Sequence, residues 1–202
     1  MAGSVGFLSG LVARATGWAD DIREMREWVE KAQIEVKWEA RDASFLRALQ
    51  CMLELLHCIV ADIRSRLIYE IPIHAPGTRL ASVLRNASTS ASGETHARWL
   101  GAGVKNLFIV SDNKSRFADA LYLFRQAGGV LDGIEGDMRA SMQDLWEFLV
   151  LRKLPRNWPL TVHYELAMIV EALMVALACL HSIRACLWGL VNRPESNPVW
   201  KK

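Results

Sequence analysis

The chain has 202 residues, of which 51% are hydrophobic, and its charges nearly balance, with 24 Lys and Arg against 22 Asp and Glu. A chain of this length and apolar content can bury a substantial core, which excludes an intrinsically disordered protein. The formal net charge of +2 excludes a strong positive field that would collect phosphates, so we expect no nucleic-acid partner.

The first predicted element is an amphipathic helix that starts near Val5. Its apolar residues recur every three or four positions, which places them on one face of a helix. These residues are Phe7, Leu8, Leu11, Val12, Ala15, Trp18, Ala19, Ile22 and Met25. Such a stripe is typical both of a core-packing helix and of a helix that lies in the headgroup layer of a membrane. We therefore take the large residues of its first half as candidate membrane or partner contacts, namely Phe7, Leu8, Leu11, Val12 and Trp18.

A second helix is predicted from about Asp42 to Tyr69, followed by breaks at two prolines. Residues 71–77 contain Pro72 and Pro76, and proline lacks an amide donor and pushes the preceding residue to extended geometry. Residues 86–96 (NASTSASGETH) are small and polar. We expect an exposed flexible loop there, between an N-terminal half over residues 1–85 and a C-terminal half over residues 97–202, with both halves in one compact unit.

The second half begins with a stretch that two structures fit. Residues 104–110 are compatible with either a helix or a β-strand, but the glycines at 101 and 103 precede them, whereas a dinucleotide fold requires its glycines after the strand. A helix is predicted from Phe117 to Gln126 with a stop at Gly128 and Gly129. Another helix is predicted over residues 132–154, ended by Pro155.

The last predicted helix, residues 160–190, is the most apolar part of the chain. It is marginal as a lone transmembrane span, because Glu171 is costly near the middle of a bilayer. Trp158 and Trp188 near its two ends fit interfacial anchors, and they fit equally well the ends of a buried helix in a soluble protein. We take Trp158, Glu171 and Trp188 as further candidate membrane or partner contacts. Taken together, the sequence predicts an all-α fold, a bundle of about five to six helices with a Ser/Thr-rich loop in the middle.

No pattern in the sequence points to catalysis. The five His are scattered along the chain, and no nucleophile with a base, paired carboxylates or phosphate-binding loop is found. Cys51 and Cys58 lie seven residues apart, as do Cys179 and Cys186, a spacing wider than the ligand pairs of structural zinc sites. We expect a protein that is not an enzyme, with no cofactor, no metal and no small-molecule substrate.

One segment carries a family resemblance. Phe117-Ala118-Asp119-Ala120-Leu121-Tyr122-Leu123-Phe124, running into Gly129-Val130-Leu131-Asp132, resembles the mid-chain stretch of peroxin-11 proteins. The layout, an N-terminal amphipathic helix and a C-terminal apolar helix with a short polar tail, is also similar. The resemblance implies a protein that binds, elongates and helps to divide the membranes of peroxisomes or glycosomes.

The function expected from these observations is that of a non-enzymatic helical protein associated with an intracellular membrane, with lipids and a protein partner or a second copy as its partners. A peroxisome-like organelle is the expected location, and a mitochondrial or cytoplasmic one is also compatible with the sequence. The alternative is a soluble helical interaction or assembly subunit, including a viral structural protein, whose Trp and Leu residues are covered by partner surfaces.

Overall fold

The computed structural model describes residues 2–75, 78–99, 112–151 and 155–192, and these residues form helices without any strand. The long helices are α1 (Ala2–Glu35), α2 (Ala40–Ser65), α4 (Thr78–Trp99), α5 (Asn113–Val150) and α6 (Leu160–Val191). A π-helical turn, η1 (Arg66–Glu70), and the short α3 (Ile71–His74) continue α2. The predicted all-α bundle is thereby confirmed. Residues 104–110 lie outside the described residues.

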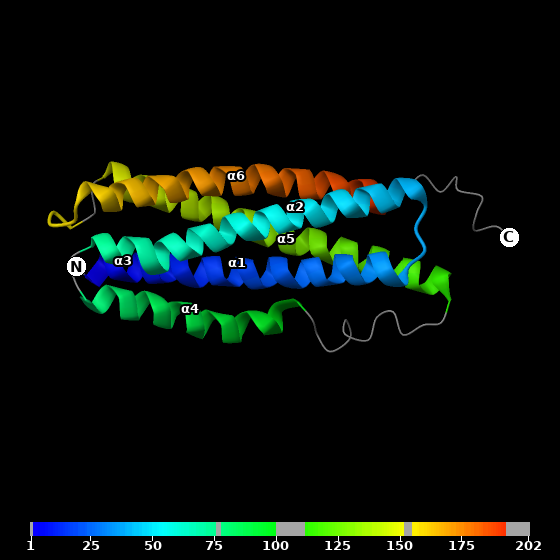
Figure 1. Cartoon of the computed structure of the whole chain (residues 1–202), viewed down its shortest axis with the longest axis horizontal. Coiled ribbons are helices and arrows are strands. Elements are labelled where there is room, and N and C mark those ends of the chain that lie inside the picture. The colour runs from blue at the N-terminus through cyan, green and yellow to red at the C-terminus, as the bar shows by residue number, and fades with distance from the viewer. Residues whose placement is uncertain (1, 76–77, 100–111, 152–154, 193–202) are drawn as a thin grey trace.

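Four of the helices form a closed ring in which neighbours run in opposite directions (Figure 1). Helix α1 packs on α2, α2 on α6, α6 on α5, and α5 on α1. Helix α4 lies outside this ring along α1, on the side away from α2, and runs parallel to α1 (Figure 1). The architecture is therefore a four-helix bundle with antiparallel neighbours, in which α4 lies between α2 and α5 in the chain and packs on α1 outside the ring.

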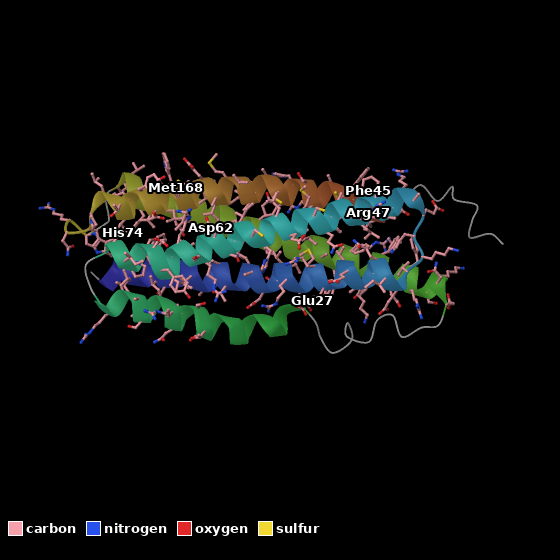
Figure 2. The ribbon with its side chains drawn as sticks, in the orientation of Figure 1. Glu27, Phe45, Arg47, Asp62, His74 and Met168 are labelled. Atoms are coloured by element: carbon pink, nitrogen blue, oxygen red, sulfur yellow. The ribbon has the colours of Figure 1, made fainter. Side chains whose placement is uncertain are left out.

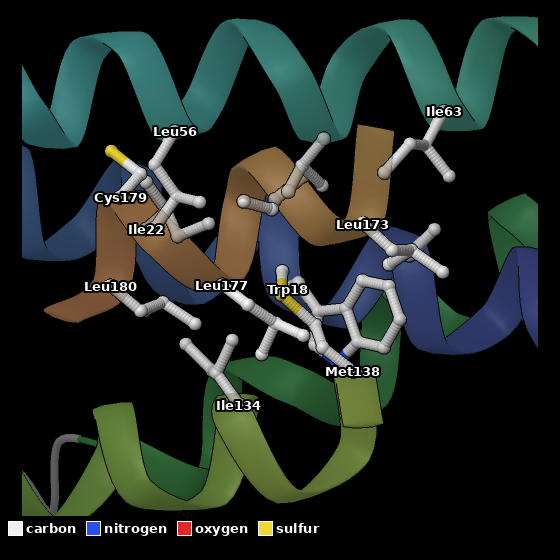
Figure 3. Close-up of a cluster of buried hydrophobic side chains, with 14 of the residues drawn as sticks. Trp18, Ile22, Leu56, Ile63, Ile134, Met138, Leu173, Leu177, Cys179 and Leu180 are labelled. Atoms are coloured by element: carbon white, nitrogen blue, oxygen red, sulfur yellow. The ribbon is translucent and has the colours of Figure 1, made fainter. Parts of the chain in front are cut away.

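A single hydrophobic cluster joins all five long helices. Figure 3 shows its middle part, where Trp18, Leu56, Met138 and Leu173, from α1, α2, α5 and α6, meet between the helices. Leu84 of α4 belongs to the same cluster and is fully buried. Residues from both sides of the expected boundary at 86–96 thus share one core.

The flexible loop predicted for residues 86–96 is wrong, because these residues belong to α4. Ser88 is only 4% exposed. Its Oγ accepts hydrogen bonds from Arg64 Nη2 at 2.8 Å and from Thr16 Oγ1 at 3.4 Å. The small side chain of Ser88 allows α4 to approach α1 closely. Thr16 of α1 and Arg64 of α2 supply hydrogen bonds to its hydroxyl. A segment without large apolar residues therefore still packs as a helix.

The predicted break at Pro72 is also wrong, whereas the one at Pro76 is correct. The helix continues through Pro72 to His74 because η1 widens the turn just before the proline, and the Ile71 N–H donates to the Arg66 carbonyl. A π-turn of this kind absorbs the missing proline hydrogen bond. The helix ends at Ala75, whose backbone is extended (ψ 129°), as expected for a residue that precedes a proline.

The stop predicted at Gly128 and Gly129 is wrong as well, since α5 runs through both without interruption. The buried positions Ala127, Leu131 and Ile134 keep the helical spacing on either side of the glycines. Burial of this continuous apolar face outweighs the cost of glycine in a helix, about 1 kcal/mol relative to alanine.

Core packing predicts a large difference between two neighbouring residues of α5. Leu145 is fully buried, whereas Trp146 is 60% exposed. Leu145→Ala leaves a cavity and should lower the free energy of unfolding by about 2–5 kcal/mol, while Trp146→Ala should change it by less than about 1 kcal/mol. Denaturant unfolding measures both. Equal effects would contradict the orientation of α5.

The continuity of α5 predicts that an alanine at Gly129 stabilises the protein. A Cβ atom at Gly129 would meet no atom within 4 Å. Gly129→Ala should therefore raise the free energy of unfolding by up to about 1 kcal/mol. Gly189→Ala is the contrast, because its Cβ would lie 3.2 Å from the ring of Phe45, and it should show no such gain. A loss of stability in Gly129→Ala would refute a helix through this position.

Candidate membrane or partner surface

The two most apolar helices of the bundle lie side by side. Residues 40–74, which comprise α2, η1 and α3, and residues 160–191 of α6 are both long and apolar enough to cross a membrane. In the most apolar 18-residue stretch of each segment, the buried share is 28% for residues 40–74 and 50% for α6. The large apolar side chains that these helices leave exposed are Leu55, Tyr69 and Ile73 in the first and Leu160, Tyr164, Met174, Val175 and Trp188 in the second. The core helix of a soluble protein passes the same test of length and composition.

The outer side of α6 carries almost no charge. Met174 and Val175 in its middle are 59% and 54% exposed, and Trp188 near its end is 69% exposed. The complete exposed set is Leu160, Thr161, Tyr164, Ala167, Glu171, Met174, Val175, Ala178, His181, Ser182, Ala185 and Trp188. Glu171 is the only acidic residue in this set, which contains neither Lys nor Arg. We call these twelve residues the outer α6 face.

The contact between α2 and α6 is close. Gly189 lies against the ring of Phe45, and the Cys179 thiol donates a hydrogen bond to the Met52 carbonyl at a sulfur–oxygen distance of 3.2 Å. Met52 and Ile59 of α2 are partly buried against the core beside this contact. The outer α6 face is consequently continuous with apolar side chains of α2.

Ion pairs hold α6 to both of its neighbours. Arg66 donates to Asp62 and to Glu165, each at 2.8 Å, and so ties the start of α6 to the end of α2. On the other flank Arg184 forms ion pairs with Asp132 and Glu135 of α5. These charges lie along the sides of the outer α6 face and fix α6 in the bundle.

Glu135 is the most strongly held carboxylate at this boundary. It is 8% exposed, and its Oε1 accepts a hydrogen bond from Arg139 Nε at 2.8 Å. This hydrogen bond, with the nearby charge of Arg184, lowers the pKa of Glu135 from its ordinary value of 4.5, although burial acts in the opposite direction. The carboxylate is therefore charged in the folded bundle at neutral pH.

The surface contact predicted for the N-terminal stripe is wrong for the closed bundle. Leu8, Leu11 and Val12 are fully buried and Trp18 is 2% exposed. Phe7 is partly buried and stacks on Phe148 of α5, with ring centroids 4.7 Å apart. The stripe packs against α2, α4 and α5 because this buries far more of its surface than a membrane interface would.

Phe7 also lines an open pocket of about 430 Å³ between the start of α1 and the end of α5. Its other lining residues are Gly3, Ser4, Asp144, Glu147 and Phe148. The described residues contain no group of three His, Cys, Asp or Glu that could hold a metal ion.

The candidates near the last helix have two different environments. Trp188 lies on the outer α6 face, and so does Glu171, which has no hydrogen bond or ion pair to any described residue. Trp158 precedes the helix and is partly buried against the core. The sequence did not single out Met174 or Val175 as surface residues, because apolar residues occupy most helical angles of α6 and leave little periodic contrast.

Comparisons of the chain with family models, with curated proteins and with solved structures find no match.

The lowered pKa of Glu135 predicts a loss of stability in acid. A carboxylate with a depressed folded pKa stabilises the fold above its unfolded pKa, and this contribution is lost as the pH falls through the folded value. Glu135→Gln should be about 1 kcal/mol less stable at pH 7 and should lose less stability than the wild type below about pH 4.5. Asp137→Asn, at an exposed position on the same helix, is the control. Parallel pH profiles for wild type and Glu135→Gln would contradict the prediction.

Proposed function

We propose that this protein is a non-enzymatic helical protein that associates with an intracellular membrane through the outer α6 face and the apolar side chains of α2 beside it. The observation that carries the proposal is the outer α6 face, on which twelve exposed residues include a single acidic side chain and neither Lys nor Arg. Soluble monomers rarely leave such a contiguous apolar area in water.

The composition of the face fits the boundary between headgroups and acyl chains. Tyr164 and Trp188 lie toward opposite ends of α6 and are 62% and 69% exposed. Aromatic rings of this amphipathic kind favour the interfacial layer, while Met174 and Val175 between them provide an apolar centre. The backbone polar groups of α6 are bonded within the helix, so no unsatisfied peptide group would enter the lipid.

The closed bundle favours lying on a membrane over crossing it. Leu173, Leu177 and Leu180 of α6 form part of the core, and Arg184 is paired with α5. A transmembrane α6 would have to give up these contacts, whereas a bundle resting on its outer face keeps them. Glu171 would then lie near the headgroups, where a carboxylate costs much less than at the bilayer centre.

The outer sides of α1 and α4 carry more charged and polar residues and would remain in water. The exposed positions of α4 include Arg79, Arg85 and Asn86, and those of α1 include Glu27 and Glu30. Figure 2 shows Glu27 on α1, away from Met168 on α6. This asymmetry gives the molecule one side for the membrane and an opposite side for solvent.

The proposal extends to shaping or dividing the membrane of a peroxisome-like organelle, and this part depends on the resemblance of residues 117–132 to peroxin-11 proteins. In the structure these residues lie within α5, where Leu123, Phe124 and Leu131 are buried. The turn that follows this pattern in peroxin-11 proteins is absent here, because α5 continues.

A second candidate function is that of a soluble assembly subunit whose partner protein covers the outer α6 face. Half of the most apolar stretch of α6 is buried in the bundle. This favours an assembly subunit, because a partner protein would have to cover only the outer side of the helix. Binding to vesicles that contain no protein separates the two functions. If the surface binds lipid, the protein sediments with the vesicles. If it binds only a partner protein, the protein stays in the supernatant.

The membrane proposal predicts that two charges on α6 abolish vesicle binding. Met174→Glu combined with Val175→Glu should weaken cosedimentation with phosphatidylcholine and phosphatidylethanolamine vesicles at least about tenfold, since each carboxylate must be desolvated. Val83→Glu is the matched control, because Val83 is an exposed apolar residue of α4. Wild-type protein that stays in the supernatant would refute the membrane proposal and leave the assembly subunit.

A further inference from the structure

A second unpartnered surface runs along the outer side of α2. Between Ser44 and Ser65, exposed residues recur at alternating steps of four and three, the spacing of a helix that packs on another helix. They are Ser44, Ala48, Cys51, Leu55, Cys58, Asp62 and Ser65. Leu55 in the middle is 47% exposed. Its two neighbours in this spaced set, Cys51 and Cys58, have small side chains. We call these seven residues, with the adjacent Arg47 and Ala61, the α2 stripe.

Three pairs of identical residues lie at mirror positions in the α2 stripe. About the point between Glu54 and Leu55, Cys51 is the mirror position of Cys58, Ala48 that of Ala61, and Ser44 that of Ser65. In the same register Arg47 is the mirror position of Asp62. Figure 2 labels both, on either side of the middle of α2. Like residues occupy three of the mirror pairs, Arg47 and Asp62 form a pair of opposite charges, and Leu55 has the exposed Glu54 as its mirror position.

The charges of this pair are not balanced within the chain. Arg47 has no ion-pair partner among the described residues, and its Nε only donates to the Ala43 carbonyl at 3.3 Å. At the other end a single guanidinium, that of Arg66, serves two carboxylates, those of Asp62 and Glu165. One end of the stripe thus carries an unpaired cation, and the other carries an excess of negative charge.

We propose that a second copy of this chain docks on the α2 stripe with its own α2 antiparallel. A twofold axis through the point between Glu54 and Leu55 then places Arg47 of each copy beside Asp62 of the other, twice in one interface. Ala48 and Ala61 allow the helices to approach closely, and the two Leu55 side chains meet beside the axis. The stripe from Ser44 to Ser65 is about 32 Å long at the rise of an α-helix.

A second copy is the occupant that the pattern specifies. A lipid surface requires neither a reversed repeat nor opposite charges at mirror positions, and an unrelated protein would not repeat the order of this chain. The proposal does not rest on membrane association, because the α2 stripe and the outer α6 face are different sets of residues and the test is made without lipid.

Cysteine cross-linking tests the register. In the proposed dimer Cys51 of one copy faces Cys58 of the other, whereas the two Cys51 residues are about 10 Å apart along the axis, too far for a disulfide. All variants carry Cys186→Ala, since Cys186 is partly exposed. Purified full-length protein is treated with copper phenanthroline as the oxidant and separated without reductant.

The protein with both α2 cysteines should give a covalent dimer, and Cys51→Ser and Cys58→Ser should each lose it. A mixture of the two single variants should regain it in about half of the dimers, because only mixed pairs place a Cys51 opposite a Cys58. Dimers formed by either single variant alone would overturn the antiparallel register. A mixture that forms none would overturn the dimer.

A charge swap tests the same interface without cysteine chemistry. Arg47→Glu and Asp62→Arg each place like charges opposite one another and should weaken the dimer about tenfold or more, and the double variant should restore it. Arg85→Glu, at an exposed position on α4, should leave the dimer unchanged. Sedimentation equilibrium measures the dissociation constant. A double variant as weak as the single ones would count against the Arg47–Asp62 pairing.

Discussion

Helix α1 is buried along eight consecutive residues, from Ala15 to Ile22, and the rest of the fold follows from this. Eight residues span more than two turns, so every side of the helix must be covered over this length. The ring of α2, α5 and α6 covers one side only, and α4 covers the other. The small residues of α4 serve this purpose, because Ser88 can lie between Thr16 and Arg64 without forcing the helices apart. None of the described residues covers the outer sides of α2 and α6 in this way.

The sequence predicted those parts of the fold in which apolar residues recur with a clear helical period. In α1 the spacing from Leu8 to Met25 identified the buried positions, because the other side of the helix carries small or charged residues. The same stripe could not show whether lipid or protein would cover it, since both require the same side chains. The contact surface placed on Leu8, Leu11, Val12 and Trp18 failed for this reason, and the one placed on Trp188 agrees with its exposure.

The errors arose where a local preference was weighed without its tertiary context. Gly128 and Gly129 weaken a helix by an amount that the neighbouring Leu131 and Ile134 outweigh by burial. Pro72 breaks a regular α-helix but is tolerated after the wider turn of η1. The polarity of residues 86–96 concealed a helix because the hydrogen-bond partners of Ser88, which are Thr16 and Arg64, lie 72 and 24 positions away in the sequence. In each case the deciding interaction is remote in sequence and cannot be read from a local window.

The two proposed surfaces are compatible because of the direction of the twofold axis. Helix α6 lies on one flank of α2 and α1 on the other. The twofold axis that relates two antiparallel α2 helices lies in their interface, perpendicular to both helices, and points from the α1 flank toward the α6 flank. Rotation about this axis keeps the α1 flank of each copy on one side and the α6 flank on the other. Both α6 helices of the dimer therefore lie on the same side, and both α1 helices lie on the opposite side. Self-association would thus present two outer α6 faces to one surface, so that binding of the first raises the effective concentration of the second. A membrane contact too weak for one copy would become firm for two.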